Sequence, residues 1–412
     1  MQFSLLWVKL AEALQGLLYT HVGFRGRSHV TMFLISFFSL YSLLHFYIFA
    51  KAKTALALSV RWSMLLVLFM LLMIAAPAIV RLFEKYELEF LARVTACVGY
   101  TWLGFLFLLV CGSILVDIYR LLLYAAGFIP GIDSAANSLR CAISARGYFL
   151  LVFSAAVLVA GYGSFEATRI GIKRVVIRTA RIPVRVSPLR IAQISDVHIG
   201  LIVRHDRVRR IMEQVKKTDP HLFVSTGDLV DGEINSLQGL AEILQEVNPR
   251  YGKFAITGNH EFYAGIKQAQ AFTKRAGFTM LRGERITVDD FLTIVGVDDP
   301  AGPGVLKGDS ELEKKLLAEA ATGRFTLLLK HRPDVEKTNL ERFDLQLSGH
   351  LHKGQIFPFR FIVRLFYPRF AGFYRLADNC SLYVSGGSGT WGPPIRFLAP
   401  PEVTLIELVH AE

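Results

Sequence analysis

The chain carries two kinds of hydrophobic pattern, which meet near residue 167. Before that point, four apolar stretches approach the ~20 residues that a helix needs to span a bilayer. They cover about residues 30–50, 62–80, 94–116 and 147–165. Arg or Lys flanks each stretch, and aromatic residues lie near several ends, as they do at membrane interfaces. The alternative, buried helices of a large soluble core, fits poorly with runs of this length that contain almost no charge. We therefore predict an all-α, four-helix transmembrane region over residues 1–167.

The first segment, residues 1–20, has Lys9 and Glu12 in its middle and no small-residue cleavage site. This pattern favours a helix lying in the membrane interface over a signal peptide. The orientation follows from the short flanks of the spans, where 13 basic residues lie on one side and 6 on the other. The positive-inside rule then predicts a multi-pass protein of a bacterial inner or plasma membrane, with both termini and the second domain in the cytoplasm.

The second pattern begins at Pro188, after a basic segment at 168–187 that we interpret as a linker. Short apolar runs end abruptly at small, acidic or histidine residues, which is typical of buried strands. The candidate strands and their ends cover 189–198, 221–231, 251–261, 291–299, 325–334, 343–352, 381–389 and 403–409. Helical patterns lie between several of them, the clearest at Val208, Ile211, Met212 and Val215. Strands that alternate with helices predict a layered α/β domain with a mixed sheet over residues 188–412.

Composition and charge narrow the class of partner. The chain is 52% hydrophobic with a mean hydropathy of +0.40 and a net charge of +12. Its basic residues are not interleaved in the way that a single-stranded nucleic-acid platform would need. We therefore expect anionic lipid headgroups of the bilayer, and no nucleic acid, as the partner of this charge. The four cysteines lack metal-ligand spacing and do not form a disulfide framework pattern.

Groups able to bind metal lie at the ends of five of the eight predicted strands. These residues are Asp196, His198, Asp228, Asn259, His331, His350 and His352. In layered α/β folds, ligands bind beyond the carboxyl ends of the strands. Carboxylate, amide and imidazole donors without a thiolate suit Mn, Fe or Zn. Seven donors exceed the needs of one tetrahedral ion and fit two ions that share a carboxylate.

The order of these residues resembles the calcineurin-like metallophosphoesterase superfamily. The five motifs are Asp196-Val197-His198, Gly227-Asp228-Leu229-Val230-Asp231, Gly258-Asn259-His260-Glu261, His331, and Gly349-His350-Leu351-His352. The resemblance covers residues 188–412. The segment from Gly349 onward is similar to the branch of the transmembrane protein with metallophosphoesterase domain and of bacterial membrane-associated phosphodiesterases. Some relatives in that branch are linked to UDP-2,3-diacylglucosamine hydrolysis in lipid A biosynthesis.

The resemblance implies an α/β/β/α sandwich that uses two divalent ions, with Mn, Fe, Zn and Mg as candidates. One ion would be bound by Asp196, His198, Asp228 and His352, and the other by Asp228, Asn259, His331 and His350. His260 would protonate the leaving oxygen, and Asp231 would orient His260. The chain departs from the phosphoprotein phosphatases of the superfamily, because Gly232 stands where they have a phosphate-binding arginine. This departure argues against phosphoprotein substrates.

The segment after the last motif, residues 357–373, is rich in aromatic and aliphatic residues separated by single arginines. It is too short and too charged to span a membrane. The first alternative is a strand and turn of the core. The second, which we favour, is an exposed apolar lip beside the site, whose arginines bind headgroup phosphates. The residues expected to contact substrate or membrane are Phe361, Arg364, Phe366 and Arg369.

These features predict a membrane-anchored, dinuclear-metal phosphodiesterase or pyrophosphatase acting on a lipid-linked phosphate, for example one similar to UDP-2,3-diacylglucosamine. Two alternatives stay open. The same chemistry could act on a soluble nucleotide or phosphodiester, with the helices serving only as an anchor. The protein could instead be a non-catalytic, metal-binding membrane sensor.

Overall fold

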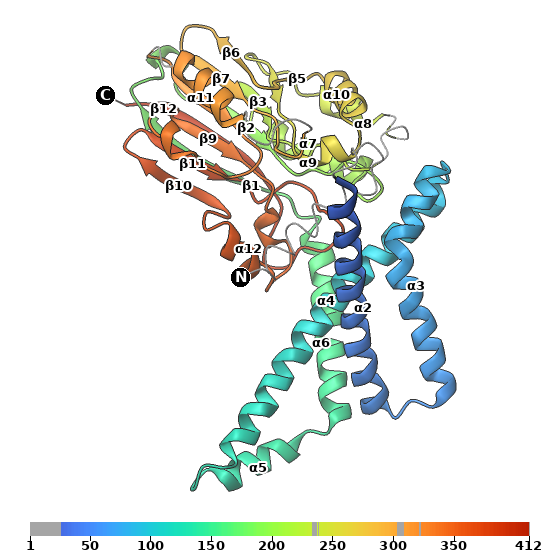
Figure 1. The fold of residues 1–412 in the computed structure, drawn as a ribbon. Coiled ribbons are helices and arrows are strands. Elements are labelled where there is room, and N and C mark those ends of the chain that lie inside the picture. Colours follow the sequence, from blue (N-terminus) through green and yellow to red (C-terminus); the bar gives the residue numbers. More distant parts are fainter. Residues whose placement is uncertain (1–25, 233–236, 238, 303–308, 321–322, 412) are drawn as a thin grey trace.

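The computed structural model describes residues 26–232, 237, 239–302, 309–320 and 323–411. Four helices at the start are long and apolar enough to cross a membrane. They are α2 (Gly26–Leu56), α3 (Val60–Lys85), α4 (Glu89–Ala126) and α6 (Ala145–Glu166). The short helix α5 (Asp133–Ala142) joins α4 to α6 at the end of the bundle far from the second domain (Figure 1). The interfacial helix expected over residues 1–20 lies outside the described residues.

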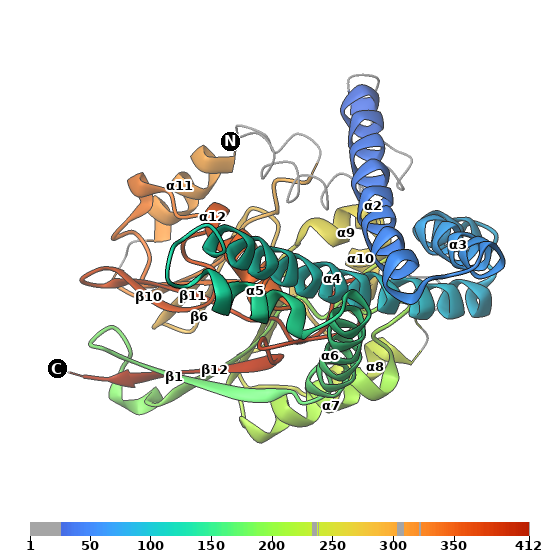
Figure 2. The same ribbon diagram turned by 90° about the horizontal axis from the view of Figure 1, so that it is seen from below.

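Small residues allow the membrane helices to pack closely. A Cβ atom added at Gly99 of α4 would lie 2.7 Å from the Cβ atom of Ala76 on α3. A Cβ atom added at Gly112 would lie 2.8 Å from Val152 on α6. Helix α4 has 38 residues and extends beyond the predicted span at 94–116, because helix-forming residues continue past the apolar run at both ends. It runs across the bundle from α3 toward α5, as Figure 2 shows from below.

The second domain contains two six-stranded sheets packed face to face. The first has the order β1-β12-β2-β3-β4-β5 and the second β10-β11-β9-β8-β7-β6. The strands of the first sheet are β1 (Gly171–Thr179), β12 (Glu402–His410), β2 (Leu189–Ile194), β3 (Leu222–Ser225), β4 (Lys253–Ala255) and β5 (Thr279–Met280). Those of the second are β10 (Gly372–Ala377), β11 (Cys380–Val384), β9 (Leu345–Ser348), β8 (Phe325–Leu329), β7 (Leu292–Gly296) and β6 (Glu284–Val288).

The helices cover the outer faces of both sheets. Helices α7 (His205–Lys217), α8 (Leu240–Gln245) and α10 (Ile266–Arg275) share a core with the first sheet. Helix α11 (Asp309–Ala320) packs on the second sheet, and strands of both sheets contribute to the core between them. Strands buried on both faces read as continuous apolar runs, which explains the pattern in the sequence. The predicted layered α/β/β/α fold behind membrane-type helices is confirmed.

The segment 168–187 is not simply a linker, because its residues Gly171–Thr179 form β1. This strand pairs in parallel with β12, from Gly171 opposite Glu402 to Thr179 opposite His410. Its first four residues are exposed, and Arg174 forms an ion pair with Glu407 of β12. An edge strand tolerates this many charges because one of its edges and much of its surface face solvent. The basic composition of this segment therefore led us to interpret a strand as a linker.

The membrane helices and the second domain are in direct contact. Ile356 and Ile395 of the second domain belong to the same buried cluster as Tyr41 of α2 and Leu106 of α4. At the edge of this contact, Arg204 forms an ion pair with Glu89 at the start of α4, with a nitrogen–oxygen distance of 2.7 Å. The domain thus packs against the sides of α2 and α4 and does not hang from a single linker (Figure 1).

Candidate active site

The loops that follow β2, β3, β4, β8 and β9 bring the seven predicted metal ligands together at one edge of the sandwich. Six of the seven side chains are buried, and His350 is half-buried. Asp196, His198, Asp228, His350 and His352 all have positive φ angles, between 46° and 77°. Such backbone conformations cost free energy for residues other than glycine and are concentrated at functional sites. The strain indicates that the surrounding structure holds these side chains in fixed positions.

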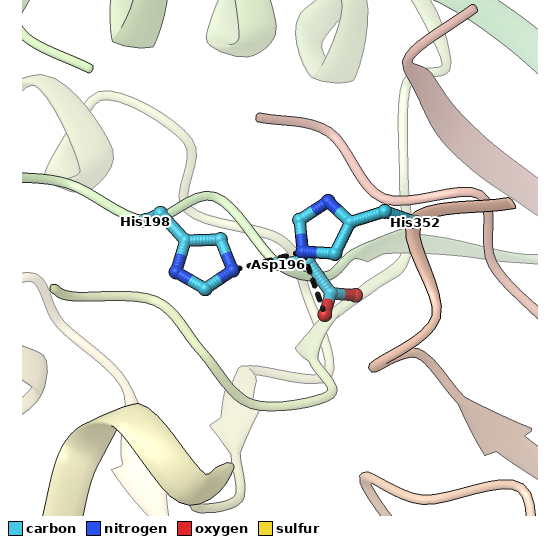
Figure 3. A group of neighbouring side chains, drawn as sticks. All are labelled: Asp196, His198 and His352. Carbon is cyan, nitrogen blue, oxygen red and sulfur yellow. Dashed lines mark hydrogen bonds and ion pairs between the residues drawn. The ribbon is translucent and has the colours of Figure 1, made fainter. Parts of the chain in front are cut away.

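The first cluster contains Asp196, His198 and His352, which come from the ends of β2 and β9 (Figure 3). The Nε2 atoms of His198 and His352 face each other at 3.0 Å. The Nε2 atom of His352 lies 3.6 Å from Oδ1 of Asp196. Two imidazole nitrogens and a carboxylate oxygen that converge in this way are suited to a metal ion that accepts all three lone pairs.

The second cluster contains Asp228, His331 and His350. Oδ2 of Asp228 lies 3.2 Å from Nε2 of His331 and 3.7 Å from Nε2 of His198, so this carboxylate stands between the two clusters. The side-chain oxygen of Asn259 is buried and has no hydrogen-bond partner in the described structure. A buried oxygen without a partner is costly unless a ligand satisfies it. The donors therefore fit two metal ions with Asp228 between them.

The electrostatics of the site favour an ionised Asp228 and a neutral His198. Burial by itself would raise the pKa of Asp228, but the neighbouring charges of His331 and His260 hold that pKa well below its usual range. Burial lowers the pKa of His198 to about 3, which keeps this imidazole neutral. A neutral imidazole and an ionised carboxylate are the forms that bind metal.

The predicted catalytic pair also forms. Nδ1 of His260 lies 2.8 Å from Oδ1 of Asp231, and Nε2 of His260 lies 4.0 Å from Asp228 and faces the cluster. Burial opposes ionisation of Asp231, but the charge of His260 holds the pKa of Asp231 at about 2. Burial likewise opposes the positive charge on His260, yet Asp228 and Asp231 together raise its pKa. A histidine held by a carboxylate and raised in pKa is suited to proton donation.

Glu261 was not among the predicted site residues, although it completes the third motif. Its carboxylate is fully buried and accepts hydrogen bonds from the backbone nitrogens of Gly258, Asp228 and Leu229 at 2.6 to 3.0 Å. These bonds tie the loop after β4 to the loop that carries Asp228. Burial, with the nearby charge of Asp228, raises the pKa of Glu261 to about 7. The residue supports the site and does not face the clusters.

A cavity of about 280 Å³ connects the site with the membrane helices. One end is formed by His198, Asp228, Asn259, His260, His350 and His352. The other end is apolar and is formed by Phe37, Tyr41 and Leu44 of α2 and by Leu103, Leu106 and Phe107 of α4. Trp391 lines the cavity beside His260, with ring centroids 6.1 Å apart.

The segment predicted to form a lip, residues 357–373, lines part of this cavity, but the residues that line it are not the ones that we predicted. It contains the short helix α12 (Arg360–Phe366), and the cavity is lined by Phe359, Val363 and Tyr367. Phe361, Arg364, Phe366 and Arg369 are absent from the lining among the described residues. The helical period explains the difference, because Val363 and Phe359 lie on one face of α12 whereas Phe361 and Leu365 lie on the other and are 58% and 76% exposed.

Comparisons with known proteins agree with this geometry. The calcineurin-like phosphoesterase family matches residues 189–354. A metallophosphoesterase of Aquifex aeolicus is 38% identical over 256 residues, which are 61% of this chain and 97% of that protein. The transmembrane protein with metallophosphoesterase domain of Danio rerio is 31% identical over 242 residues, 56% of this chain and 55% of the relative. Against that relative, the chain therefore spans about half of its length.

Among solved structures, the 5'-nucleotidase precursor from Thermus thermophilus aligns at 19% identity with a TM-score of 0.35, covering 54% of each chain. This similarity is too remote to inform the substrate. The sequence relatives, the matched family and the two Asp/His clusters support the same assignment. The chain belongs to the calcineurin-like metallophosphoesterase family, and its second domain is that of a metal-dependent phosphoesterase.

Proposed function

We propose that the protein is a membrane-anchored, two-metal phosphodiesterase or pyrophosphatase that hydrolyses a lipid-linked phosphate. The observation that carries this proposal is the single cavity shared by the metal-binding side chains and by the apolar faces of α2 and α4. A soluble substrate has no need of an apolar wall built by membrane helices. A lipid-linked phosphate has both an anionic group for the metal end and a hydrocarbon chain for the other end.

The apolar end has the properties that a hydrocarbon chain requires. Phe107 of α4 and Phe359 pack edge to face across it, with ring centroids 6.1 Å apart. Leu44 and Leu103 contribute branched side chains from two different helices. Each methylene group that leaves water for such a surface contributes about 0.8 kcal/mol. Several methylene groups would therefore account for micromolar binding of a lipid whose phosphate binds weakly on its own.

The ligands of the two ions are proposed as the sequence predicted them. Asp196, His198 and His352 would bind one ion, His331, His350 and Asn259 would bind the other, and Asp228 would contact both. When bound, the ions would supply Lewis acidity, lowering the pKa of water and stabilising negative charge on the phosphoryl oxygens.

The chain's own residues position the substrate and move the proton. Asp231 accepts from Nδ1 of His260 and so directs Nε2 of His260 toward the cluster. We propose that this Nε2 donates its proton to the oxygen of the leaving group as the bond to phosphorus breaks. Trp391 beside His260 and Tyr367 beside His350 would enclose the phosphate and limit the access of bulk water.

We further propose that the catalytic domain faces the cytoplasm. Arg81 and Lys85 at the end of α3 and Arg169 after α6 lie at the ends of the helices nearest the catalytic domain. Fewer basic residues, among them Lys53 and Arg140, lie at the opposite ends. Basic flanks of short loops remain on the cytoplasmic side. A cysteine-labelling experiment from either side of sealed vesicles would test this orientation.

The proposal is tested with full-length protein in detergent, stripped of metal with a chelator and resupplied with Mn, Fe, Zn or Mg one at a time. Hydrolysis of bis-p-nitrophenyl phosphate should return with metal and should be absent in Asp228→Ala. A lipid screen beginning with UDP-2,3-diacylglucosamine should then give a higher kcat/KM than the matching soluble nucleotides. Equal or higher kcat/KM on soluble nucleotides would overturn the lipid assignment. Metal binding without turnover of any substrate would favour a sensor.

A further inference from the structure

Residues 385–399, which form most of the loop between β11 and β12, contact both the metal site and the membrane helices. We call this segment loop 385–399. Toward the site, the backbone nitrogens of Ser388 and Gly389 donate to the carbonyl oxygens of Ser195 and Asp196, at 2.8 and 3.0 Å. A Cβ atom at Gly389 would lie 1.9 Å from the carbonyl oxygen of Val197. The backbone of loop 385–399 therefore approaches the loop after β2 too closely for any side chain at this position. This loop therefore supports the strained backbone that presents Asp196 and His198.

Arg396 is the central side chain of this loop and is fully buried. Its Nη1 atom donates to the carbonyl oxygens of Gly386, Ala399 and His352, at 2.6 to 3.2 Å, and Nε donates to that of Gly389 at 3.0 Å. Its Nη2 atom lies 3.1 Å from Nδ1 of His352, the ring whose other nitrogen faces the first cluster. The guanidinium thus joins loop 385–399 to the backbone of a predicted metal ligand, through the carbonyl oxygen of His352.

Burying a guanidinium that is satisfied mainly by carbonyl oxygens is unfavourable, because its charge leaves water. The planar fork can satisfy several carbonyl groups in fixed directions, which a lysine cannot do. This geometry is suited to holding two loops at a defined distance. In metal sites, residues that orient a ligand typically change metal affinity about 10- to 100-fold when they are replaced, so we expect that range here.

The opposite side of loop 385–399 rests on the membrane helices. The backbone nitrogen of Arg396 donates to the carbonyl oxygen of Gly163 on α6 at 2.9 Å. The backbone nitrogen of Leu398 donates to the buried carboxylate of Glu166 at the end of the same helix, at 3.1 Å. Ile395 is fully buried against this surface, and a Cβ atom at Gly104 of α4 would lie 3.0 Å from it.

We propose that Arg396 is a positioning residue for the ligand His352 and that α6 holds Arg396 in place through loop 385–399. The membrane region then does more than anchor the enzyme, because it forms part of the support of the metal centre. This inference goes beyond the proposed function, since it holds for any substrate. It requires only that the first cluster binds metal.

The first test measures metal binding in full-length apo-protein by titration with Co²⁺, followed by calorimetry and by the visible absorption of the bound ion. In Arg396→Lys, one of two Co²⁺ ions should bind about 10- to 100-fold more weakly, with a changed absorption spectrum. Arg181→Lys is the control, because Arg181 pairs with Asp344 and touches neither cluster. Wild-type affinity and spectrum in Arg396→Lys, with unfolding temperatures like those of the control, would overturn the positioning role.

The second test isolates the contribution of α6 with two glycines on the same helix. A Cβ atom at Gly163 would lie 2.6 Å from Ile395 and 2.8 Å from the carbonyl oxygen of Arg396, whereas a Cβ atom at Gly161 meets nothing within 4 Å. Gly163→Ala should therefore weaken the same Co²⁺ ion that Arg396→Lys weakens, and Gly161→Ala should not. Gly112→Ala, whose Cβ atom would lie 2.8 Å from Val152 within the bundle, separates this effect from general destabilisation.

The outcomes are distinct. A loss of Co²⁺ affinity in Gly163→Ala, with unchanged affinity in Gly161→Ala and Gly112→Ala, supports the connection from α6 to the metal centre. Equal losses in Gly163→Ala and Gly112→Ala would show that any disturbance of the bundle has this effect. That result, or no loss in Gly163→Ala, overturns the role of α6. Neither result bears on whether the substrate is a lipid.

Discussion

The two ends of the cavity are built in opposite ways. At the metal end, buried carboxylates and imidazoles are held by residues with positive φ angles, and Glu261 fixes the backbone behind them. At the membrane end, side chains of the regular helices α2 and α4 form an apolar wall. The first end depends on a few atoms at fixed distances. The second depends on the area and shape of a surface.

This contrast predicts that mutations can change the rate of hydrolysis and the preference for lipid substrates separately. A change at the metal end removes interactions made to the transition state, so every substrate is affected. A change at the apolar end removes binding that only a hydrocarbon chain uses, so short soluble substrates are spared. The following predictions test this separation.

The largest effect is expected at His260. Loss of a general acid typically costs about 10²- to 10⁴-fold in rate when the leaving group is a poor one. His260→Asn should therefore reduce kcat by that factor on alkyl phosphodiesters, whose leaving oxygen needs a proton. The loss should be much smaller on bis-p-nitrophenyl phosphate, whose leaving group departs as a stable anion. Steady-state kinetics on both substrates provides the comparison.

A uniform loss on both substrates would contradict proton donation by His260. Glu261→Gln is an informative partner variant, because Glu261 supports the backbone of Asp228 and does not face the reacting atoms. Its effect should be similar for both leaving groups. The ratio of the two rate constants, and not the size of either loss, distinguishes a proton donor from a structural residue.

An intermediate effect is expected from filling the apolar end. Leu103→Trp would occupy space on α4 that we assign to the hydrocarbon chain. Excluding two or three methylene groups costs about 2 kcal/mol, which is about 30-fold in kcat/KM for a lipid substrate. The same variant should hydrolyse bis-p-nitrophenyl phosphate at the wild-type rate. Leu121→Trp is the control, because Leu121 lies on the same helix and is 65% exposed.

The smallest effect is expected on the outer face of α12. Arg364 is exposed there, beside the exposed side chains of Phe361 and Leu365. One arginine near an anionic membrane surface contributes about 1 kcal/mol, or about 5-fold in binding. Arg364→Gln should therefore lower turnover of a lipid in anionic vesicles by this factor and leave turnover in neutral detergent unchanged. Arg275→Gln on α10 is the control. Wild-type turnover of Arg364→Gln in anionic vesicles would contradict a contact between α12 and the membrane.

Much of the fold could be predicted because buried strands leave a clear record in the sequence. The apolar runs that became β2, β3, β8 and β9 end at the residues that form the clusters. Both the strands and their ends are local features, so the sequence pattern predicts them without knowledge of distant contacts. The four membrane-type helices were recognisable for the same reason, as lengths of uncharged residues.

The features that were missed depend on contacts between distant segments. We interpreted the residues of β1 as a linker. They form a strand because they pair with β12, which lies at the far end of the domain sequence. Leu103 faces the cavity, but its apolar run looks the same as a run that faces lipid. Arg396 belongs to no motif, and its role is visible only when Gly163 and His352 are seen on either side of it.

The central claim, that one cavity binds both phosphate and hydrocarbon, is tested most directly by a chain-length series. We would measure kcat/KM of the full-length enzyme for p-nitrophenyl alkyl phosphodiesters from methyl to dodecyl, each below its micelle concentration. The account predicts a rise of up to about 4-fold per methylene group, at about 0.8 kcal/mol each, until the cavity is filled. The rise should end at a shorter chain in Leu103→Trp. A kcat/KM that does not change with chain length would contradict the account.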